Sequence, residues 1–89
     1  MRTIQQSRVF RKNLKKAKSR GKDLTKLVRV IELLQKDAKL PPYLRDHALG
    51  GEFIGFRDCH IEPDWVLIYK KEGNTLLLLY MTGSHADLF

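Results

Sequence analysis

The stretch "RDCHIEPDW", Arg57 to Trp65, holds an arginine, a histidine, three carboxylates and the only cysteine of the chain. The other two histidines, His47 and His85, lie in "RDHALGG" and "TGSHADLF". Imidazoles beside carboxylates are suited to general acid–base catalysis, because the pKa of histidine lies near neutrality. Cleavage of an RNA phosphodiester needs little more: a base removes the 2′-hydroxyl proton, an acid protonates the leaving 5′ oxygen, and donors hold the charge on the phosphorane.

Each of these residues also has an ordinary structural explanation when it is taken alone. His47 fits an exposed loop histidine, and His85 fits a surface histidine near the C-terminus. Asp64 fits a turn-forming aspartate that bonds local N–H groups. Cys59 is best interpreted as a small buried residue and Trp65 as core or rim packing. The nuclease hypothesis therefore depends on whether the side chains converge.

A metal site is the rival use of the same residue types. Asp58, His60 and His85 could supply a partial ligand set, but nothing shows the tight paired spacing of a structural zinc site. We therefore expect no metal and no other cofactor.

Length and composition indicate one small globular domain, residues 1–89, with 43% hydrophobic residues. No apolar run approaches the ~20 residues of a membrane span, and the start "MRTIQQSRVFRKN" has no apolar signal region. A single cysteine forms no internal disulfide. These features favour a cytoplasmic protein with no membrane partner.

Charge divides the chain into two halves. Residues 1–40 hold 13 of the 17 Lys and Arg and three acids, a net charge of +10, whereas residues 41–89 hold four basic residues and seven acids, a net charge of −3. A basic half attracts polyanions such as RNA, the ribosome or an acidic protein. Five cations of the first expected helix are the candidate RNA- or ribosome-docking residues: Arg11, Lys12, Lys15, Lys16 and Lys18.

The order of elements predicted is β-α-α-β-β-β. "RTIQQ" is a short candidate strand, Ser7 caps a helix to about Arg20, and Asp23 caps a second helix to about Ala38. The buried stripe of that second helix is expected to be Leu24, Leu27, Val28, Ile31, Leu34 and Ala38.

After the loop "YLRDHALGGE" the hydrophobic period changes to two. "FIGFRDCHI", "WVLIYKK" and "TLLLLYMT" are expected strands joined by the turns "PD" and "EGN", and "GSHADLF" is a short tail. The predicted fold is α+β: two N-terminal helices packed on one face of a small, mainly antiparallel four-stranded sheet.

Strand alternation decides which residues share a face. Asp58 and His60 are two apart and therefore point to the same side, whereas Cys59 points to the other, towards the helices. A meander brings neighbouring strands within about 5 Å, so His60, Asp64 and His85 can converge on the open sheet face. His47 joins them if its loop folds over that face.

The second half resembles the YafQ branch of the RelE toxin superfamily. The matching segments are "RDHALGGEFIGFRDCHIEPDWVLIYK" and "TGSHADLF", which follow the family's "DH-L-G" loop, "G-RD-H--PDW-LIY" hairpin and terminal "TG-H--LF" in order and spacing. The basic helical half matches only in layout. The resemblance implies a RelE-like fold and the toxin of a bacterial toxin–antitoxin pair.

Members of that family are endoribonucleases, or mRNA interferases, that cut mRNA, usually at the ribosome. By resemblance, the catalytic residues are His47, His60, Asp64 and His85, and Asp58 and Phe89 also match functional positions and are expected to contact the substrate. Trp65 and Arg57 are the other candidate substrate-binding residues. The implied partner is an acidic antitoxin that wraps the toxin and blocks its site; operator DNA is contacted only through that complex.

One position departs from the family pattern. Relatives often carry an arginine four residues before the last histidine, where this chain has Met81. Arg57, Lys70 or a protonated histidine could take its place, although Arg57 is expected to point away from Asp58. Two non-nucleolytic alternatives stay open: a toxin like those of the related ParE branch, which block DNA gyrase, and a plain RNA- or ribosome-binding module.

Overall fold

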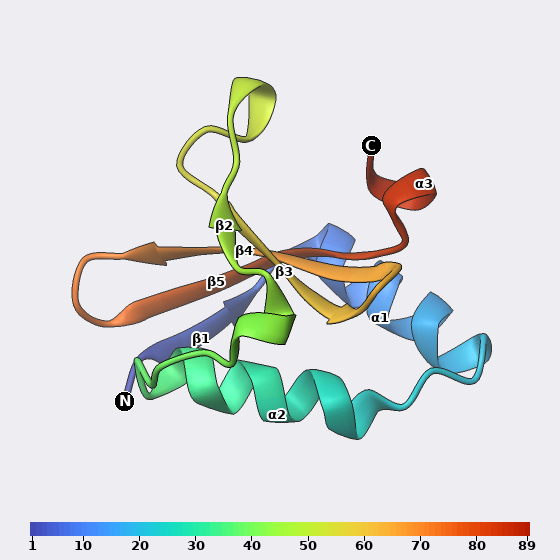
Figure 1. Ribbon diagram of the computed structural model, residues 1–89, viewed down its shortest axis with the longest axis horizontal. Coiled ribbons are helices and arrows are strands. Elements are labelled where there is room, and N and C mark those ends of the chain that lie inside the picture. Colours follow the sequence, from blue (N-terminus) through green and yellow to red (C-terminus); the bar gives the residue numbers. More distant parts are fainter.

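The computed structural model describes all residues from 1 to 89 and confirms the α+β fold. Two helices cover one face of a five-stranded sheet whose strand order is β1-β5-β4-β3-β2 (Figure 1). The elements in chain order are β1 (Thr3–Gln6), α1 (Arg8–Ser19), α2 (Leu24–Gln35), β2 (His47–Ala48), β3 (Arg57–Glu62), β4 (Trp65–Glu72), β5 (Leu76–Gly83) and α3 (His85–Leu88).

Both long helices begin at the predicted caps. The Ser7 hydroxyl accepts a hydrogen bond from the Phe10 N–H, and the Asp23 carboxylate accepts one from the Thr25 N–H. Each side chain satisfies one of the N–H groups that the first turn of a helix leaves without a partner. Between the helices, Gly21 has a φ of +78°, a left-handed conformation that glycine adopts without steric cost.

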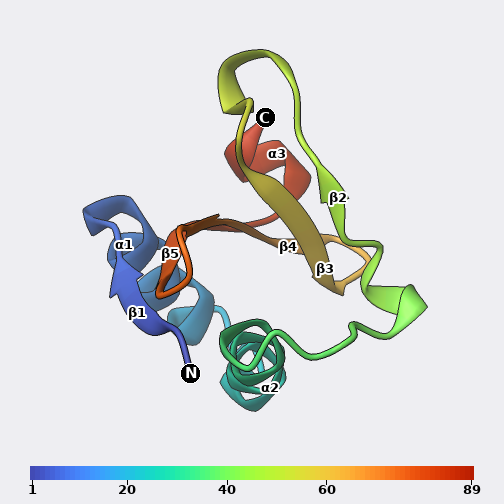
Figure 2. The same ribbon diagram turned by 90° about the vertical axis from the view of Figure 1, so that its left-hand side faces the viewer.

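The three C-terminal strands form the expected antiparallel meander. Glu62 pairs with Trp65 across a two-residue turn that contains Asp64, so this turn lies at the end of β3 beside the start of β4. β5 pairs with β4 and also, in parallel, with β1, which forms one edge of the sheet (Figure 2). The last residue of β5, Gly83, therefore lies beside Val66 of β4, near the same turn.

The hydrophobic core lies between the helices and one face of the sheet. Its thirteen buried residues include Phe10 of α1 and Leu27, Val30 and Leu34 of α2. Cys59 is fully buried in this core, as expected. The predicted stripe of α2 was wrong in part: Val28 is 52% exposed, because Val30 faces the core instead.

Four local predictions differ from the structure. The sheet has five strands and not four, because the two residues of β2 pair with the start of β3; so short a strand shows no alternation in the sequence. The expected strand "FIGFRDCHI" begins only at Arg57, since Gly51–Phe53 forms a 3₁₀ turn. α2 ends at Gln35, before Asp37 with its φ of +54°.

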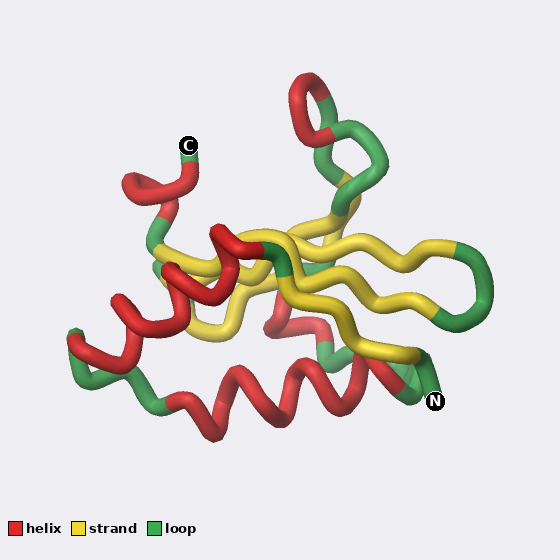
Figure 3. The backbone as a smooth tube through the Cα atoms, turned by 180° about the vertical axis from the view of Figure 1, so that it is seen from behind, coloured by secondary structure: helices red, strands yellow, loops and turns green.

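The C-terminal tail, the fourth difference, contains the short helix α3. Ser84 and Asp87 form a capping box, in which each side chain accepts a hydrogen bond from the backbone N–H of the other. That signal is readable in "SHAD". Seen from behind, α3 stands on the opposite side of the sheet from α2 (Figure 3).

None of the helices has the length and the apolar character that a membrane-spanning helix needs.

The buried hydroxyl of Thr82 ties β4 to β5 inside the core. It accepts a hydrogen bond from the Trp65 indole at 2.9 Å and donates one to the Val66 carbonyl at 2.8 Å. We predict that Thr82→Val, which keeps the shape but removes the hydroxyl, lowers the free energy of unfolding by about 1–3 kcal/mol, because a buried indole N–H loses its partner. Urea unfolding measures this loss. Thr82→Ser should retain most of the stability; equal stability of the Val variant would contradict the prediction.

Candidate active site

The face of the sheet opposite the helices carries the candidate site. The segment between β2 and β3 and the helix α3 both rise above this face, on either side of it (Figure 1). Val66 and Ile68 alternate with the core residues of β4 and are nonetheless fully buried, so they form the apolar floor of the site. Asp58 and His60 of β3 stand beside this floor, since they pair with Ile68 and Val66.

The three histidines come together in a row, as the strand geometry predicted. The ring centroids of His47 and His60 are 6.2 Å apart, and those of His60 and His85 are 5.3 Å apart. They come from β2, β3 and α3. His47 joins the row because β2 pairs with β3 and places it opposite Asp58, and not because its loop folds over the open face. Its middle ring is largely shielded, with 13% of the His60 side chain exposed, whereas the outer rings are about half exposed.

Asp58 is a buried carboxylate placed between the first two rings. Its side chain is 4% exposed, and Oδ1 lies 3.5 Å from Nδ1 of His47 and 3.8 Å from Nδ1 of His60. Neither Asp58 Oδ1 nor His60 Nδ1 has a hydrogen-bond partner within the protein. A buried anion without a partner is costly, so these two atoms are poised to pair when a ring gains a proton.

Asp64 holds the third ring. Its Oδ1 accepts hydrogen bonds from Nδ1 of His85 at 2.9 Å and from the His85 backbone N–H at 3.1 Å. These bonds keep the pKa of Asp64 below its ordinary value. Because Nδ1 donates to the carboxylate, Nε2 is the nitrogen of His85 that is left to exchange a proton with a ligand.

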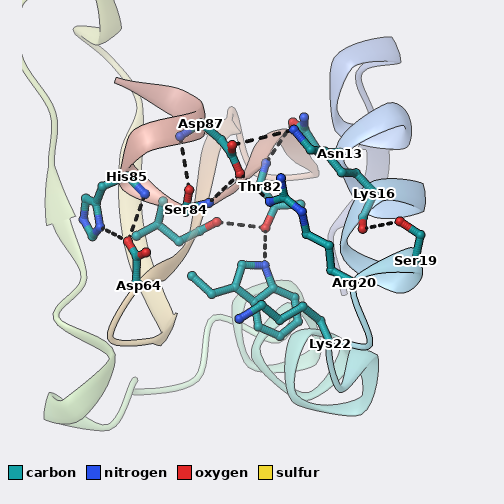
Figure 4. A network of polar contacts seen from close by, with 12 residues as sticks. Asn13, Lys16, Ser19, Arg20, Lys22, Asp64, Thr82, Ser84, His85 and Asp87 are labelled. Atoms are coloured by element: carbon teal, nitrogen blue, oxygen red, sulfur yellow. Dashed lines mark hydrogen bonds and ion pairs between the residues drawn. The ribbon is translucent and has the colours of Figure 1, made fainter.

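Two ion-pair clamps hold the short elements that carry Asp64 and His85, and Figure 4 shows the residues of the first clamp beside this pair. In the first, the Asp87 carboxylate of α3 accepts a hydrogen bond from Arg20 at 2.9 Å and lies 3.6 Å from the Lys16 ammonium. The pKa of Asp87 falls to about 2, chiefly because of Arg20 and then Ser84. α3 has four residues and cannot be stable alone, so this clamp sets the position of His85.

The second clamp acts on the turn that carries Asp64. The Glu62 carboxylate accepts hydrogen bonds from Lys26 at 2.9 Å and Lys22 at 3.1 Å, which lowers its pKa. Together the clamps line a cleft of about 550 Å³ behind the Asp64–His85 pair. The sequence interpretation missed both, because the partners are 36 to 71 residues apart and come from opposite halves of the chain.

A third polar network connects the segment that carries His47 to strands β3 and β4. Asp46 accepts hydrogen bonds from the Tyr69 hydroxyl and from Arg57 Nε, the latter at 2.7 Å. Burial and the neighbouring Asp46 carboxylate raise the pKa of Tyr69. His47 itself donates from Nδ1 to the Arg45 carbonyl at 2.8 Å. Asp46, which the sequence interpretation also missed, thus ties the His47 loop to the core strands.

Two of the predicted substrate-contacting residues are turned away from the site. Arg57 is on the face opposite Asp58, as its alternation predicted, and its guanidinium pairs with Asp46. Trp65 is 1% exposed within the helix-side core and its indole bonds to Thr82, so the structure favours packing for this residue. Phe89, in contrast, is 58% exposed, and its ring centroid is 6.2 Å from that of His85.

The position of Met81 is on the open face, in the same register row as Asp58 and with Ile68 between them. A cation here would face the histidine row across Ile68. Lys70 is also on this face, two residues after Ile68 along β4 and further from the histidines. Its ammonium lies 3.3 Å from Glu72. Of the candidate replacements for the family arginine, Arg57 is therefore the one that the fold directs away.

The basic face of α1 is open to solvent. Arg11, Lys12, Lys15, Lys16 and Lys18 are all exposed, and of these only Lys16 is engaged in an ion pair, with Asp87. No group of three or more His, Cys, Asp or Glu side chains is arranged to hold a metal ion.

The Asp64–His85 contact has a measurable signature. We predict that the Asp64 carboxyl titrates below its ordinary pKa of 3.8 and returns towards it in His85→Ala. Because this pKa is lower in the folded protein than in the unfolded chain, the contact adds to the free energy of unfolding at pH values above the ordinary pKa. This contribution is lost as the pH falls through the folded-state pKa. Carbon-detected NMR titration measures both variants. Asp23, whose pKa is lowered by Thr25, is the internal control and should not move; an unchanged Asp64 in His85→Ala would contradict the geometry.

Comparison with known proteins identifies the family to which the chain is similar. The family model of YafQ, a bacterial toxin of type II toxin–antitoxin systems, matches residues 2–89. The mRNA interferase toxin YafQ of Escherichia coli strain K12 is 44% identical over 89 residues, which cover 99% of this chain and 96% of that protein. A chain of the E. coli DinJ–YafQ toxin–antitoxin complex is 44% identical, with a TM-score of 0.89 and coverage of 99% and 97%. A metal-bound toxin from Helicobacter pylori is 40% identical, with a TM-score of 0.93 and full coverage of both chains. This chain therefore belongs to the YafQ family of bacterial toxins of type II toxin–antitoxin systems.

Proposed function

We propose that this protein is an endoribonuclease that cuts mRNA by metal-independent general acid–base catalysis and so inhibits translation in the cytoplasm. The observation that carries the proposal is the row of three imidazoles on the open sheet face, with the Asp58 carboxylate between the first two rings and the Asp64 carboxylate bonded to the third. The mRNA interferase activity that names the E. coli relative supports it. A gyrase blocker or a simple binding module has no use for such a row.

The reaction needs one imidazole as base and one as acid. The base takes the 2′-hydroxyl proton, the 2′ oxygen attacks the adjacent phosphorus, and the bond to the 5′ oxygen breaks as the acid protonates it. The products are a 2′,3′-cyclic phosphate and a 5′-hydroxyl. His85 exchanges its proton at Nε2, since Nδ1 is bonded to Asp64. His60 is its partner in the row, and His47 holds the phosphate or shares in proton transfer.

A protonated imidazole compensates the negative charge on the phosphorane. Met81 offers no charge, and Arg57 faces the other side of the sheet. A histidine that has taken a proton gains a positive charge next to the buried Asp58 carboxylate, whose Oδ1 is free to accept from it. The positive ring then compensates the phosphorane from the side opposite that carboxylate.

The same surfaces suggest the partners. The exposed cations of α1 would contact ribosomal RNA phosphates, which would leave the open face on the other side of the sheet free for mRNA. An acidic antitoxin, the counterpart of DinJ in the E. coli complex, would cover the basic half and block the site. Operator DNA would be bound only through that complex.

Cleavage of a defined mRNA tests the proposal. The purified protein is incubated with the mRNA in EDTA, with and without programmed ribosomes, and the cut sites and end groups are mapped. We predict cyclic-phosphate and 5′-hydroxyl ends, and a loss of about 10²–10⁴-fold in rate for His85→Ala and for His60→Ala, the usual contribution of a general acid or base. Asn74→Ala, in the β4–β5 turn far from the site, is the control. Toxicity that survives the double histidine substitution in cells would favour a binding toxin.

The Arg20–Asp87 clamp should act on the rate of the chemical step. We predict that Asp87→Arg lowers kcat by about ten- to a hundredfold, because small displacements of a catalytic group have effects of this size. KM should change little, since Asp87 faces away from the histidine row.

Two variants separate positioning from general stability. Combining Asp87→Arg with Arg20→Asp should restore most of kcat by reversing the pair. Asp37→Arg is the matched control, because Asp37 also joins two cations, Arg2 and Lys71, but lies far from His85. Equal losses of kcat in the Asp37 and Asp87 variants would show that the clamp only stabilises the fold.

A further inference from the structure

A row of aromatic rings leads away from the catalytic end of the open face. The ring centroid of Phe89 lies 6.2 Å from that of His85, Phe53 lies 5.6 Å from Phe89, and Tyr80 lies 6.4 Å from Phe53. The row ends at Phe56, which stacks on Tyr80 at 4.6 Å with an angle of 27° between the ring planes. The rings come from β5, the residue that follows α3 and the segment that precedes β3.

Tyr80 and Met81 both face this side of the sheet because β5 has a bulge. Ile68 pairs with Met81 and Tyr69 pairs with Leu79, which leaves Tyr80 as the extra residue without a partner on β4. A bulge redirects the side chain of its extra residue, and bulges are common next to active sites. Leu77 and Leu79 face the core, so regular alternation already directs Tyr80 to the open face, and the bulge turns Met81 to that face as well.

Lys70 supplies a cation at the far end of the row. Its ammonium lies 5.4 Å from the ring centroid of Phe56, and 35% of its side chain is exposed. Its one ion-pair partner, Glu72, is on the same strand and half exposed, so the ammonium is able to exchange this contact for a phosphate. Phe56 and Tyr80 are themselves only partly buried.

We propose that Tyr80, Phe56 and Lys70 form a nucleotide subsite for the RNA strand, separate from the nucleotides at the scissile bond. A base of the RNA stacks on the aromatic pair and its phosphate lies against Lys70, the combination by which single-stranded nucleic acids are held without sequence preference. The subsite rests on the proposed ribonuclease function and extends it. Its continuity with Phe89 and His85 gives the direction in which the strand leaves the reactive centre.

The competing explanation is structural. The same rings could do no more than pack the segment before β3 and the C-terminus onto the sheet. Such packing predicts that removing Tyr80 weakens every function of the open face to the same degree. A subsite predicts instead that the loss belongs to one nucleotide of the ligand.

An abasic scan of a short RNA separates the two. Every 2′-hydroxyl of the RNA is replaced by fluorine, so that binding is measured without cleavage, and one base at a time is removed. With the wild-type protein, we expect one position outside the scissile pair at which removal of the base weakens binding by about five- to 150-fold, the usual range for one stacked base. In Tyr80→Ala this penalty disappears and the penalties at other positions remain. Tyr80→Phe keeps the full pattern.

Lys70 is tested by the salt dependence of binding. Lys70→Gln should reduce the slope of log Kd against log salt by about one phosphate contact. Lys71→Gln is the matched control, because Lys71 is next in sequence but points to the other face, where it pairs with Asp37. An unchanged slope for Lys70→Gln overturns its role.

The remaining outcomes are also decisive. A penalty that persists in Tyr80→Ala, a uniform loss at all positions, or no measurable binding by the wild-type protein overturns the subsite. If mRNA is cleaved but no Tyr80-dependent position exists, the subsite fails and the nuclease function stands. If that position exists but mRNA is not cleaved under any condition, the nuclease function fails and the subsite stands as a binding site.

Discussion

The contact between Asp64 and His85 joins the two parts of the candidate site that have no rigid frame of their own. Asp64 lies in a two-residue turn, and His85 begins a helix of four residues. One carboxylate oxygen accepts from both the backbone and the ring of His85, so it fixes the position of α3 and the orientation of the imidazole together. The row of histidines closes only because this contact places its third member.

The basic half of the chain has a second use besides attracting polyanions. Arg20 and Lys16 reach Asp87, and Lys22 and Lys26 reach Glu62, so four of its cations brace the back of the site. Exposed ion pairs contribute little to the free energy of unfolding. Their value here is geometric, since each clamp restrains one of the two short elements that meet at Asp64. A polyanion that competes for these cations would therefore also loosen the catalytic end.

Alternation along β3 made most of the site predictable. Asp58, His60 and Cys59 have the faces that a period of two assigns, because a buried sheet face fixes the register strongly. Helix caps and the meander were equally local signals. What the sequence could not show depends on partners far apart in the chain, as for Arg20 and Asp87, or on elements too short for periodicity, as for β2. The burial of Trp65 has a similar cause, because nothing local distinguishes a core tryptophan from one at the rim.

The substitution at Met81 has a consequence for how charge is distributed over the open face. With an apolar residue opposite Ile68, the side chains that carry or gain positive charge there are the histidines and Lys70. The histidines lie next to Asp58 and Asp64, and Lys70 lies at the end of the aromatic row. Positive charge at the reactive centre is then tied to proton transfer itself, because an imidazole becomes cationic only when it takes a proton. The base ring gains its positive charge only as it takes the 2′-hydroxyl proton, whereas the acid ring carries its charge before the reaction and loses it with the proton that it gives to the 5′ oxygen.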